Sequence, residues 1–494
     1  MPMSSTDPHV LDTIVKAYDV RGTVPDQFNA TVAHALGVGF ARFAGAPRVL
    51  VGRDMRNSGP ELVEAFAAGV TEQGVDVVDL GLVSTDLVYY AAGTYDAPGA
   101  IFTASHNPAQ YNGVKFCLGG ARPVGQDTGL DQVKATAAEV LAGRGPARAV
   151  ATGSVSQRNV LEAFADHVVS FIDIDAIRPM RVVADTANGM GGLVVPAVFS
   201  RIPQITLEVM YGDLDGTFPN HPADPLQPAN QRDLQARVVS GGFDVGLAFD
   251  GDADRVFVVD ETGRGLSGST TTALLAAAVL RTHPGATVLH NLICSRAVPE
   301  VIREHGGVPV RTKVGHSFIK QVMAETGAVF GGEHSAHYYF AGNFRADSGL
   351  IAAMLVLDEL SRANTDLSVL RKPFERYSSS GEINTHVDDP QQVLEQLSIT
   401  GLALSELRQS YERYAMSGEI NTRVEDTDAV IERVAAAYAP FPIDRIDGLT
   451  VDCGPWWFNL RPSNTEPLLR LNLEARDRDE CDQHVAELLA LITA

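Results

Sequence analysis

Short apolar segments alternate with segments of helical periodicity over the first three quarters of the chain. Residues 48–54 predict a buried strand that ends in a polar loop, residues 61–73 a helix with its apolar side chains on one face, and residues 75–80 a second strand. Further strands are expected at residues 182–184, 245–249, 288–291 and 308–310. Strands that alternate with helices in this way indicate βαβ units and mostly parallel sheets.

The same order of elements restarts near residues 155, 268 and 375, and its character changes toward the end of the chain. There, residues 457–460 and 469–474 alternate apolar and polar side chains, which predicts a half-exposed antiparallel sheet. The predicted fold class is therefore α/β, with three related α/β domains that have mixed sheets, followed by a C-terminal α+β domain. The expected divisions are residues 1–150, 151–266, 267–373, a duplicated junction segment at 374–410, and 411–494.

The junction carries an internal repeat. Residues 367–397 align with residues 404–434 at an offset of 37 residues, and 17 of the 31 aligned positions are identical. The string Gly-Glu-Ile-Asn-Thr thus occurs twice, at residues 381–385 and 418–422. Because a solenoid needs about three or more stacked repeats, two copies indicate a tandem duplication between two domains. The sequence leaves open which copy occupies the ancestral place.

The composition limits the possible partners. The chain of 494 residues is 45% hydrophobic and 20% charged, which excludes a wholly disordered protein. Its net charge of −22 repels phosphate backbones and anionic lipid, so no nucleic-acid or membrane partner is expected. The four cysteines are scattered along the chain, which fits a reducing compartment. The first ten residues show neither a basic start nor an apolar stretch, so no secretion signal is visible, and we expect a cytoplasmic location.

A first polar loop, Thr-Ala-Ser-His-Asn-Pro at residues 103–108, directly follows the apolar residues 99–102. Its proline keeps the preceding residue out of helical geometry. Ser105 and His106 are therefore expected at the tip of a strand, where α/β sheets bind their ligands. Taken alone, the same string is equally compatible with an ordinary turn.

A second polar loop, Asp-Gly-Asp-Ala-Asp-Arg, lies at residues 250–255 between two apolar segments. Asp250, Asp252 and Asp254 can converge on one hard cation through oxygen ligands. The loop lacks the final Glu of an EF-hand, and the alternative of a solvated acidic turn is disfavoured because strands on both sides force the charges together. The neighbouring Arg255 suits an anion shared with that metal.

Two later loops suit a phosphorylated sugar. Residues 331–337, Gly-Gly-Glu-His-Ser-Ala-His, offer a carboxylate and a hydroxyl to adjacent sugar hydroxyls. His334 and His337 have no third ligand nearby in the sequence, so a zinc site is rejected. Residues 461–467, Arg-Pro-Ser-Asn-Thr-Glu-Pro, can form a nest of donors for a phosphate, although this string alone would be taken for a turn.

Together and in this order, the loops resemble those of the α-D-phosphohexomutase family, in particular its phosphomannomutase/phosphoglucomutase members. The resemblance extends from Lys16–Gly22 to Arg461–Pro467, which is nearly the whole chain. It implies four domains around a central cleft, with Mg²⁺ as cofactor. It also implies an enzyme that interconverts hexose 6-phosphate and hexose 1-phosphate, of mannose and also of glucose, through a phosphoserine and a hexose 1,6-bisphosphate, which also serves as activator. We expect a monomer or dimer whose partner is a small hexose phosphate.

The resemblance also assigns roles to individual residues. The catalytic group consists of the phosphorylated serine and three neighbours, with the lysine as the favoured general acid/base: Ser105, His106, Lys115 and Arg255. The metal ligands are the three aspartates and an oxygen on the serine: Asp250, Asp252, Asp254 and Ser105. Residues expected to bind the sugar and the reacting end are Tyr18, Arg21, Gly315, His316, Glu333, Ser335 and His337. Residues expected to bind the non-reacting phosphate are Arg461, Ser463, Asn464 and Thr465.

Three alternatives remain to be tested. Phosphoglucosamine mutases resemble this chain but usually carry Gln where it has His334, which argues against that substrate. A non-catalytic sugar-phosphate-binding relative is disfavoured because Ser105, Lys115 and all three aspartates are present. A serine phosphatase would leave the remote phosphate site without a purpose.

Overall fold

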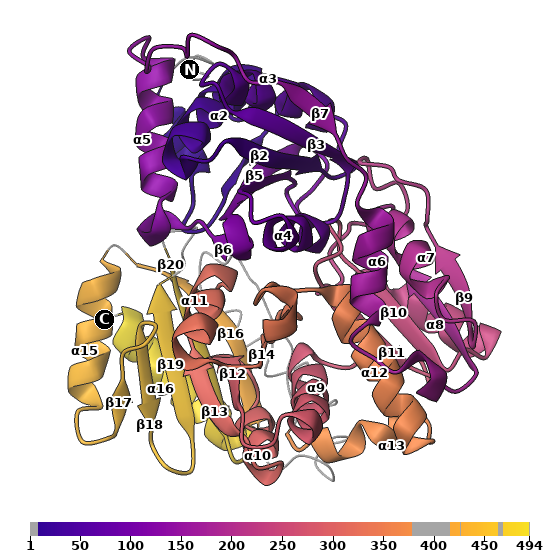
Figure 1. Ribbon diagram of the computed structural model, residues 1–494. Helices are drawn as coiled ribbons and strands as arrows, with labels where there is room; N and C mark the ends of the chain where they lie inside the picture. Colours follow the sequence, from indigo (N-terminus) through magenta and orange to yellow (C-terminus); the bar gives the residue numbers. More distant parts are fainter. Residues whose placement is uncertain (1–7, 378–414, 425, 463–467, 494) are drawn as a thin grey trace. The chain divides into compact units, whose positions relative to one another are not determined.

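The computed structural model describes residues 8–377, 415–424, 426–462 and 468–493, apart from the side chains of residues 316–317 and 415–416 (Figure 1). The described residues fall into two compact units. The first contains the described residues up to His290, together with Val298–Val310 and Gly315–Lys372. The second contains Asn291–Ala297, Arg311–Val314 and the described residues from Pro373 onward.

The first unit begins with a seven-stranded mixed sheet. Its strands are β1 (Val20–Thr23), β2 (Arg48–Arg53), β3 (Asp76–Leu82), β4 (Gly99–Phe102), β5 (Tyr111–Leu118), β6 (Arg122–Pro123) and β7 (Val155–Gln157). Its helices are α1 (Val10–Ile14), α2 (Ala30–Ala44), α3 (Gly59–Thr71), α4 (Thr85–Thr94) and α5 (Leu130–Leu141). The strand order is β1-β5-β4-β2-β3-β7, with β6 paired to β5, and β2 runs parallel to both β3 and β4.

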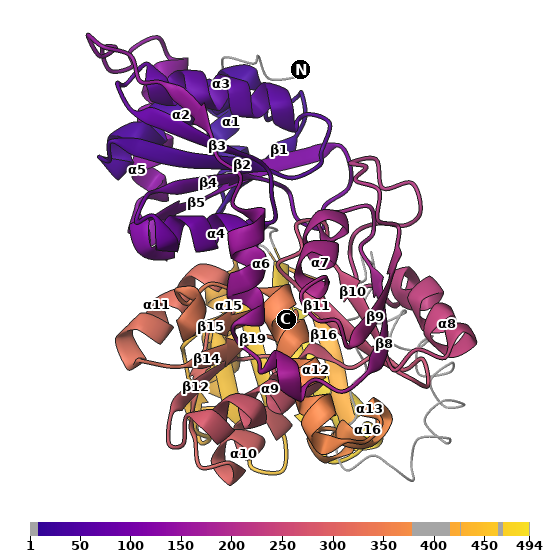
Figure 2. The same cartoon turned by 45° about the vertical axis from the view of Figure 1, so that its right-hand side comes forward.

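An apolar core joins helices α2, α3 and α5 to one face of this sheet, whereas α4 lies on the opposite face (Figure 2). Phe40, Phe66 and Phe116 form a stacked aromatic group at its centre. The predicted strand, helix and strand between residues 48 and 80 are confirmed as β2, α3 and β3. Helix α3 begins before the predicted start because Pro60 fits its first turn, where no backbone donor is needed.

Two four-stranded mixed sheets follow. The first contains β8 (Met180–Asp185), β9 (Ile205–Met210), β10 (Val245–Phe249) and β11 (Val256–Asp260), in the order β11-β10-β8-β9, with helices α6 (Leu161–Val169), α7 (Gly191–Phe199) and α8 (Arg232–Gly241). The second contains β12 (Thr287–Asn291), β13 (Val308–Thr312), β14 (Phe330–Gly332) and β15 (Tyr338–Phe340), in the order β13-β12-β14-β15. Its helices are α9 (Gly268–Thr282), α10 (Ala297–Glu304), α11 (His316–Thr326), α12 (Gly349–Ala363) and α13 (Leu367–Leu370). The expectation of three α/β domains with mixed sheets is confirmed.

Three of the polar loops occupy the same place in their sheets. Residues 103–110 join β4 to β5, residues 250–255 join β10 to β11, and residues 333–337 join β14 to β15. In each case the first strand is parallel to an inner strand and the second returns antiparallel at its side. Each loop also contains one non-glycine residue with left-handed backbone, namely Ser105, Ala253 or Ala336. The three domains thus repeat one device, a tight turn beyond the carboxyl end of a parallel strand.

The second unit contains a five-stranded antiparallel sheet. Its strands are β16 (Ala415–Arg423), β17 (Ile443–Asp444), β18 (Leu449–Asp452), β19 (Trp457–Pro462) and β20 (Leu468–Ala475), in the order β16-β20-β19-β18-β17. Helices α15 (Thr427–Ala437) and α16 (Arg478–Thr493) pack on its apolar face through residues such as Phe458 and Leu471.

The prediction that this sheet is half-exposed is wrong. Asn459, Arg461 and Glu474 lie on the polar face and are nevertheless buried. Neighbouring strands supply part of the partners that these groups need: Trp457 donates to Glu474, and Asn459 donates to the Thr450 hydroxyl. Burial of polar groups is tolerable where such partners exist, and alternation alone does not separate this case from exposure.

The second copy of the repeat supplies β16, since Gly418–Thr422 lies inside that strand. The corresponding residues of the first copy, and most of the predicted junction segment at 374–410, lie outside the described residues. The undescribed stretch 378–414 has the same length as the repeat offset. Because β16 is the first strand in the order of this sheet, the second copy supplies its edge strand.

Among the helices of the described residues, none combines the length and apolar character required to cross a bilayer.

Candidate active site

Ser105 lies in the turn after β4, and its side chain contacts the loop after β10. Its hydroxyl donates to Asp250 Oδ2 at 2.8 Å, and the Arg255 guanidinium donates to the same hydroxyl at 3.2 Å. The two loops touch closely, because a Cβ added at Gly251 would lie 2.5 Å from the Ser105 carbonyl oxygen. Glycine is therefore needed at this position. This steric requirement explains why a glycine separates Asp250 from Asp252.

Arg56 holds the serine loop in shape. Its buried guanidinium donates to four backbone carbonyls of that loop, those of Ser105 at 2.9 Å, Asn107 at 2.6 Å, and Pro108 and Tyr111 at 2.8 Å each. The left-handed backbone of Ser105, with φ 49°, is unfavourable for a residue with a Cβ and persists only where its surroundings impose it. We infer that Arg56 imposes it.

The three aspartates of the second loop converge as predicted. One oxygen from each of Asp250, Asp252 and Asp254 lies within 4.8 Å of the others, and all three side chains are buried. Lys115 from β5 lies between two of them and donates to Asp252 Oδ2 at 2.9 Å and to Asp254 Oδ2 at 2.8 Å. The Oδ1 atoms of Asp252 and Asp254 are buried without a hydrogen-bond partner. Such oxygens fit a hard divalent cation.

The charges of this cluster shift the pKa values in opposite directions. Burial raises the pKa of Asp250 well above its ordinary value despite the charge of Arg255. Burial also acts to raise the pKa of Asp252, but the charge of Lys115 and the hydrogen bond from Thr85 outweigh it, so this pKa is lowered. Burial acts to lower the pKa of Lys115, but the two aspartates raise it well above the usual value, so the lysine carries a proton.

His106 and Arg21 complete the surroundings of the serine. Arg255 donates to His106 Nδ1 at 2.6 Å, which requires an unprotonated nitrogen there. Burial and the charges of Arg255 and Arg21 lower the pKa of His106 well below its ordinary value, so the imidazole is neutral. Arg21 donates to the Asn107 side chain at 2.6 Å and is paired with Asp19. The predicted residues His106 and Arg21 therefore lie beside Ser105.

The loop after β14 lies next to residues 250–255, which we call the metal loop because its three aspartates are the candidate ligands of a cation. His337 Nε2 is 3.7 Å from Asp254 Oδ1, and His337 Nδ1 is 3.1 Å from the Ser335 hydroxyl. Glu333 accepts hydrogen bonds from the Tyr339 hydroxyl at 2.8 Å and from the Gly315 amide at 3.2 Å. A Cβ on Gly315 would lie 3.5 Å from the Tyr18 ring. The first unit thus gathers Tyr18, Gly315, Glu333, Ser335 and His337 with the serine and metal loops.

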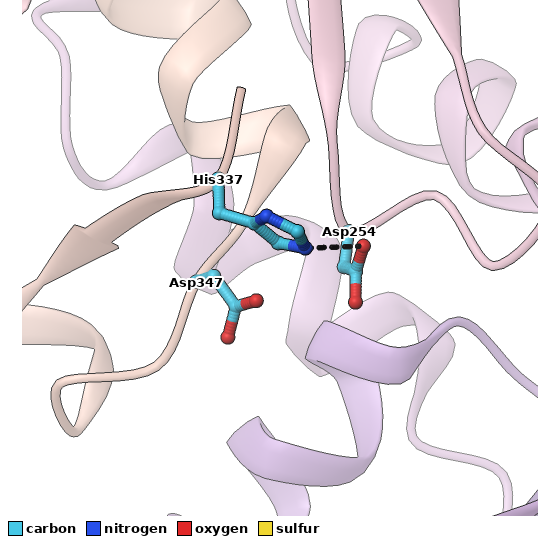
Figure 3. A group of neighbouring side chains, drawn as sticks. All are labelled: Asp254, His337 and Asp347. Carbon is cyan, nitrogen blue, oxygen red and sulfur yellow. Dashed lines mark ion pairs between the residues drawn. The ribbon is translucent and has the colours of Figure 1, made fainter. Parts of the chain in front are cut away.

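A second group of possible metal ligands adjoins the first. Figure 3 shows His337 between the carboxylates of Asp254 and Asp347, and one ligand atom from each lies within 4.8 Å of the others. Asp347, however, is paired with Lys320 at 2.8 Å. The aspartate triplet offers three carboxylates and this group only two, so the triplet is the better candidate for a hard cation.

In the second unit, two arginines share one carboxylate. Glu419 is 3.2 Å from Arg461 and 3.0 Å from Arg470. The predicted phosphate-binding residues Ser463, Asn464 and Thr465 lie outside the described residues, as does the side chain of His316.

The predictions from the sequence did not include two residues of this site, Arg56 and Thr85. Both follow the carboxyl end of a parallel strand, β2 and β3 respectively, where α/β sheets gather their chemistry. That position is the one signal in the sequence that points to them.

The fold and the site define a class of enzyme: a phosphoryl-transfer protein with a buried serine beside a cluster of aspartates that could hold a cation. Family models cover four successive parts of the chain: the phosphoglucomutase/phosphomannomutase α/β/α domains I (residues 12–142), II (162–264) and III (267–377), and the C-terminal domain (419–491). The chain belongs to the phosphoglucomutase/phosphomannomutase family, which confirms the resemblance inferred from its motifs.

Individual relatives agree over nearly the full length. A protein of Xanthomonas campestris pv. campestris named "Phosphohexose mutases" is 37% identical over 93% of this chain and 94% of its own length. A phosphomannomutase of Salmonella typhimurium is 36% identical over 97% of this chain and 99% of its own. The crystal structure of a phosphoglucomutase/phosphomannomutase family protein from Burkholderia thailandensis matches with a TM-score of 0.79 and 29% identity, covering 97% of this chain and 98% of that one.

Proposed function

We propose that this chain interconverts hexose 6-phosphate and hexose 1-phosphate, of mannose and also of glucose, through a phosphoserine at Ser105. It is an isomerase of the phosphotransferase type. The observation that carries the proposal is the contact of the Ser105 hydroxyl with both Asp250 and Arg255, next to carboxylate oxygens that lack partners. A serine in this position can carry a phosphoryl group beside a metal.

Asp250, Asp252 and Asp254, with an oxygen on Ser105, would hold Mg²⁺. Their buried oxygens are the hard ligands that this ion prefers. When bound, Mg²⁺ supplies positive charge that stabilises the phosphoryl oxygens during transfer.

The protein's own cations act on the same group. Arg255 donates a hydrogen bond to the Ser105 hydroxyl, and Lys115 carries a proton. Both residues therefore place positive charge where the phosphoryl group passes. In the forward step, the P–O bond to Ser105 breaks as a bond forms to the free hydroxyl of the sugar. As the proposed acid/base, Lys115 gives its proton to the Ser105 oxygen as that P–O bond breaks and takes up the proton of the attacking sugar hydroxyl, so it ends the step protonated again.

The sugar is held by Glu333 and Ser335, whose carboxylate and hydroxyl match adjacent sugar hydroxyls, with Tyr18, Arg21, Gly315, His316 and His337 around them. Arg461, Ser463, Asn464 and Thr465 bind the phosphate that is not being transferred. The resulting hexose 1,6-bisphosphate turns around before it returns the other phosphate to Ser105, and added bisphosphate therefore activates the enzyme. A cytoplasmic location suits the four buried cysteines, which form no disulfide with one another.

Mass spectrometry of peptides from the purified protein tests the covalent step. One phosphate on Ser105, lost on incubation with substrate and restored by hexose 1,6-bisphosphate, is the expected result. Protein that never carries phosphate there would instead indicate a non-catalytic binding protein, and steady release of free phosphate would indicate a phosphatase.

Phosphorus NMR with the 1-phosphates of mannose, glucose and glucosamine, each with a trace of bisphosphate, tests the substrate. We expect conversion of the first two. A strong preference for the amino sugar would overturn this choice of substrate in favour of a phosphoglucosamine mutase.

A further inference from the structure

The start of helix α4 reaches from the first sheet to the metal loop. Thr85, its first residue, is fully buried, and its hydroxyl donates to Asp252 Oδ2 at 2.6 Å. Its backbone amide also donates to the Asp252 carbonyl oxygen at 3.1 Å. Thr85 therefore binds both the main chain and the side chain of Asp252, which lies 167 positions away in the sequence.

These contacts occupy one oxygen of Asp252 and fix the plane of its carboxylate, so that the other oxygen is left for the cation. Oδ2 accepts from both Thr85 and Lys115, whereas Oδ1 is buried and has no hydrogen-bond partner. Turning the carboxylate plane away from this orientation would lengthen both bonds, whereas a half-turn only exchanges two equivalent oxygens. Hydrogen bonds behind a metal ligand fix its orientation in this way, and their loss typically weakens metal binding.

We propose that Thr85 is a positioning residue for the metal site, whose hydroxyl turns Asp252 Oδ1 toward the cation. The inference rests on the proposed function, because it assumes that the aspartate triplet binds Mg²⁺. Lys115 also orients Asp252, but it pairs with Asp254 as well, so Thr85 is the donor specific to this one ligand.

The hydroxyl of Thr85 is not needed to anchor the helix. The next residue, Asp86, accepts hydrogen bonds from the hydroxyls of Ser84 and Ser348, and the amide of Thr85 keeps its own bond to Asp252. Replacing the hydroxyl by a methyl group therefore removes one hydrogen bond and leaves the helix start in place.

The test compares Thr85→Val, which has nearly the same shape but no donor, with Thr85→Ser, which keeps the donor. Mg²⁺ binding to the full chain is measured by calorimetry, and Mn²⁺ binding by electron paramagnetic resonance. We expect the dissociation constant of Thr85→Val to rise roughly 10- to 100-fold, the range found for groups behind metal ligands, and that of Thr85→Ser to stay near wild type. Turnover of the Val variant should recover at saturating Mg²⁺, and melting temperatures in EDTA should match.

Unchanged metal affinity in Thr85→Val would overturn the proposal, and so would equal weakening in both variants, which would indicate packing rather than hydrogen bonding. If the Val variant does not fold, Thr85→Ala is compared with Thr85→Ser by the same criteria. Asp252→Asn separates this proposal from the function on which it rests. If that variant binds Mg²⁺ normally, the metal site itself is wrong, whereas weakening by Asp252→Asn without any by Thr85→Val refutes only the role of Thr85.

Discussion

The reacting centre of the first unit and the arginine pair of the second unit handle charge in different ways. Around Ser105, two cations, Lys115 and Arg255, each contact the buried aspartates of one loop. In the second unit, Arg461 and Arg470 share the single carboxylate of Glu419. Among the described residues, the Nε atoms of both arginines and the amide nitrogen of Asn472 are buried without an acceptor.

We attribute the difference to the role proposed for each region. Phosphoryl transfer requires the charged groups around the serine to keep fixed positions. The ion pairs of Lys115 and Arg255 with the aspartates fix these positions. Binding a phosphate without reacting requires donors that are still free to receive its oxygens. Changes in the first unit should therefore act on kcat, and changes in the second on KM.

The largest effect is expected from Asp252→Asn. The amide loses the charge that holds a divalent cation, so turnover should fall by more than the roughly 10- to 100-fold typical of changes behind a metal ligand. Kinetics at increasing Mg²⁺ and melting curves in EDTA measure the two consequences, and folding should change far less than turnover. Unchanged turnover at saturating metal would count against the metal site.

Arg56→Lys should come next. A lysine keeps the charge near Asp54 but cannot bond four carbonyls at once, so the serine loop loosens. We expect kcat to fall about 100-fold, since small misplacements of reacting groups cost that much. The measurement is kcat at saturating substrate, alongside urea unfolding. A kcat close to wild type would show that Ser105 keeps its place without Arg56.

In the second unit, Arg461→Lys should raise KM for the hexose phosphate roughly 10- to 100-fold, the worth of a charge-assisted hydrogen bond. Because the phosphate that Arg461 is proposed to bind does not react while it is held there, kcat should change little. Arg476→Lys is a matched control, since Arg476 is exposed and its ion pairs with described residues are those with Asp477 and Glu480 around the start of α16. A fall in kcat at constant KM would remove the contrast between the two regions.

Asp86 should affect stability rather than catalysis. Burial raises its pKa from 3.8 to about 7, so between these values the folded protein keeps a proton that the unfolded chain has lost. Stability should therefore fall as the pH rises through this window, by up to about 1.4 kcal/mol per pH unit, and the loss is complete above about pH 7. Urea unfolding of wild type and Asp86→Asn at several pH values isolates this contribution, because the variant lacks the titrating group. Parallel pH profiles would contradict it.

The smallest effect is expected from deleting residues 374–410. The deletion removes one copy of the repeat and keeps Gly418–Thr422 in strand β16, so kcat, KM and the melting temperature should stay close to wild type. Loss of activity would mean that the extra copy has become part of the structure.

The sequence predicted the reacting loops because each one directly follows an apolar strand, which places its polar residues at the edge of a sheet. Asp250, Asp252 and Asp254 also lie at alternate positions of one short loop, so their convergence could be predicted from local sequence alone. The support around them was harder to predict. Arg56 and Thr85 bind residues 49 and 167 positions away along the chain, and only the folded structure brings these residues together. The buried polar face of the C-terminal sheet was missed because alternation does not distinguish water from a protein partner.

One measurement tests most directly whether Ser105 and the aspartate triplet form a single centre. Phosphorus NMR of the phosphorylated protein is recorded with Mg²⁺ and then with Mn²⁺, whose unpaired electrons broaden the signals of nearby nuclei. We expect the Ser105 phosphate signal to disappear with Mn²⁺ in the wild type and to survive in Asp252→Asn at the same metal concentration. A sharp phosphoserine signal in wild-type protein that has demonstrably bound Mn²⁺ would contradict the central claim.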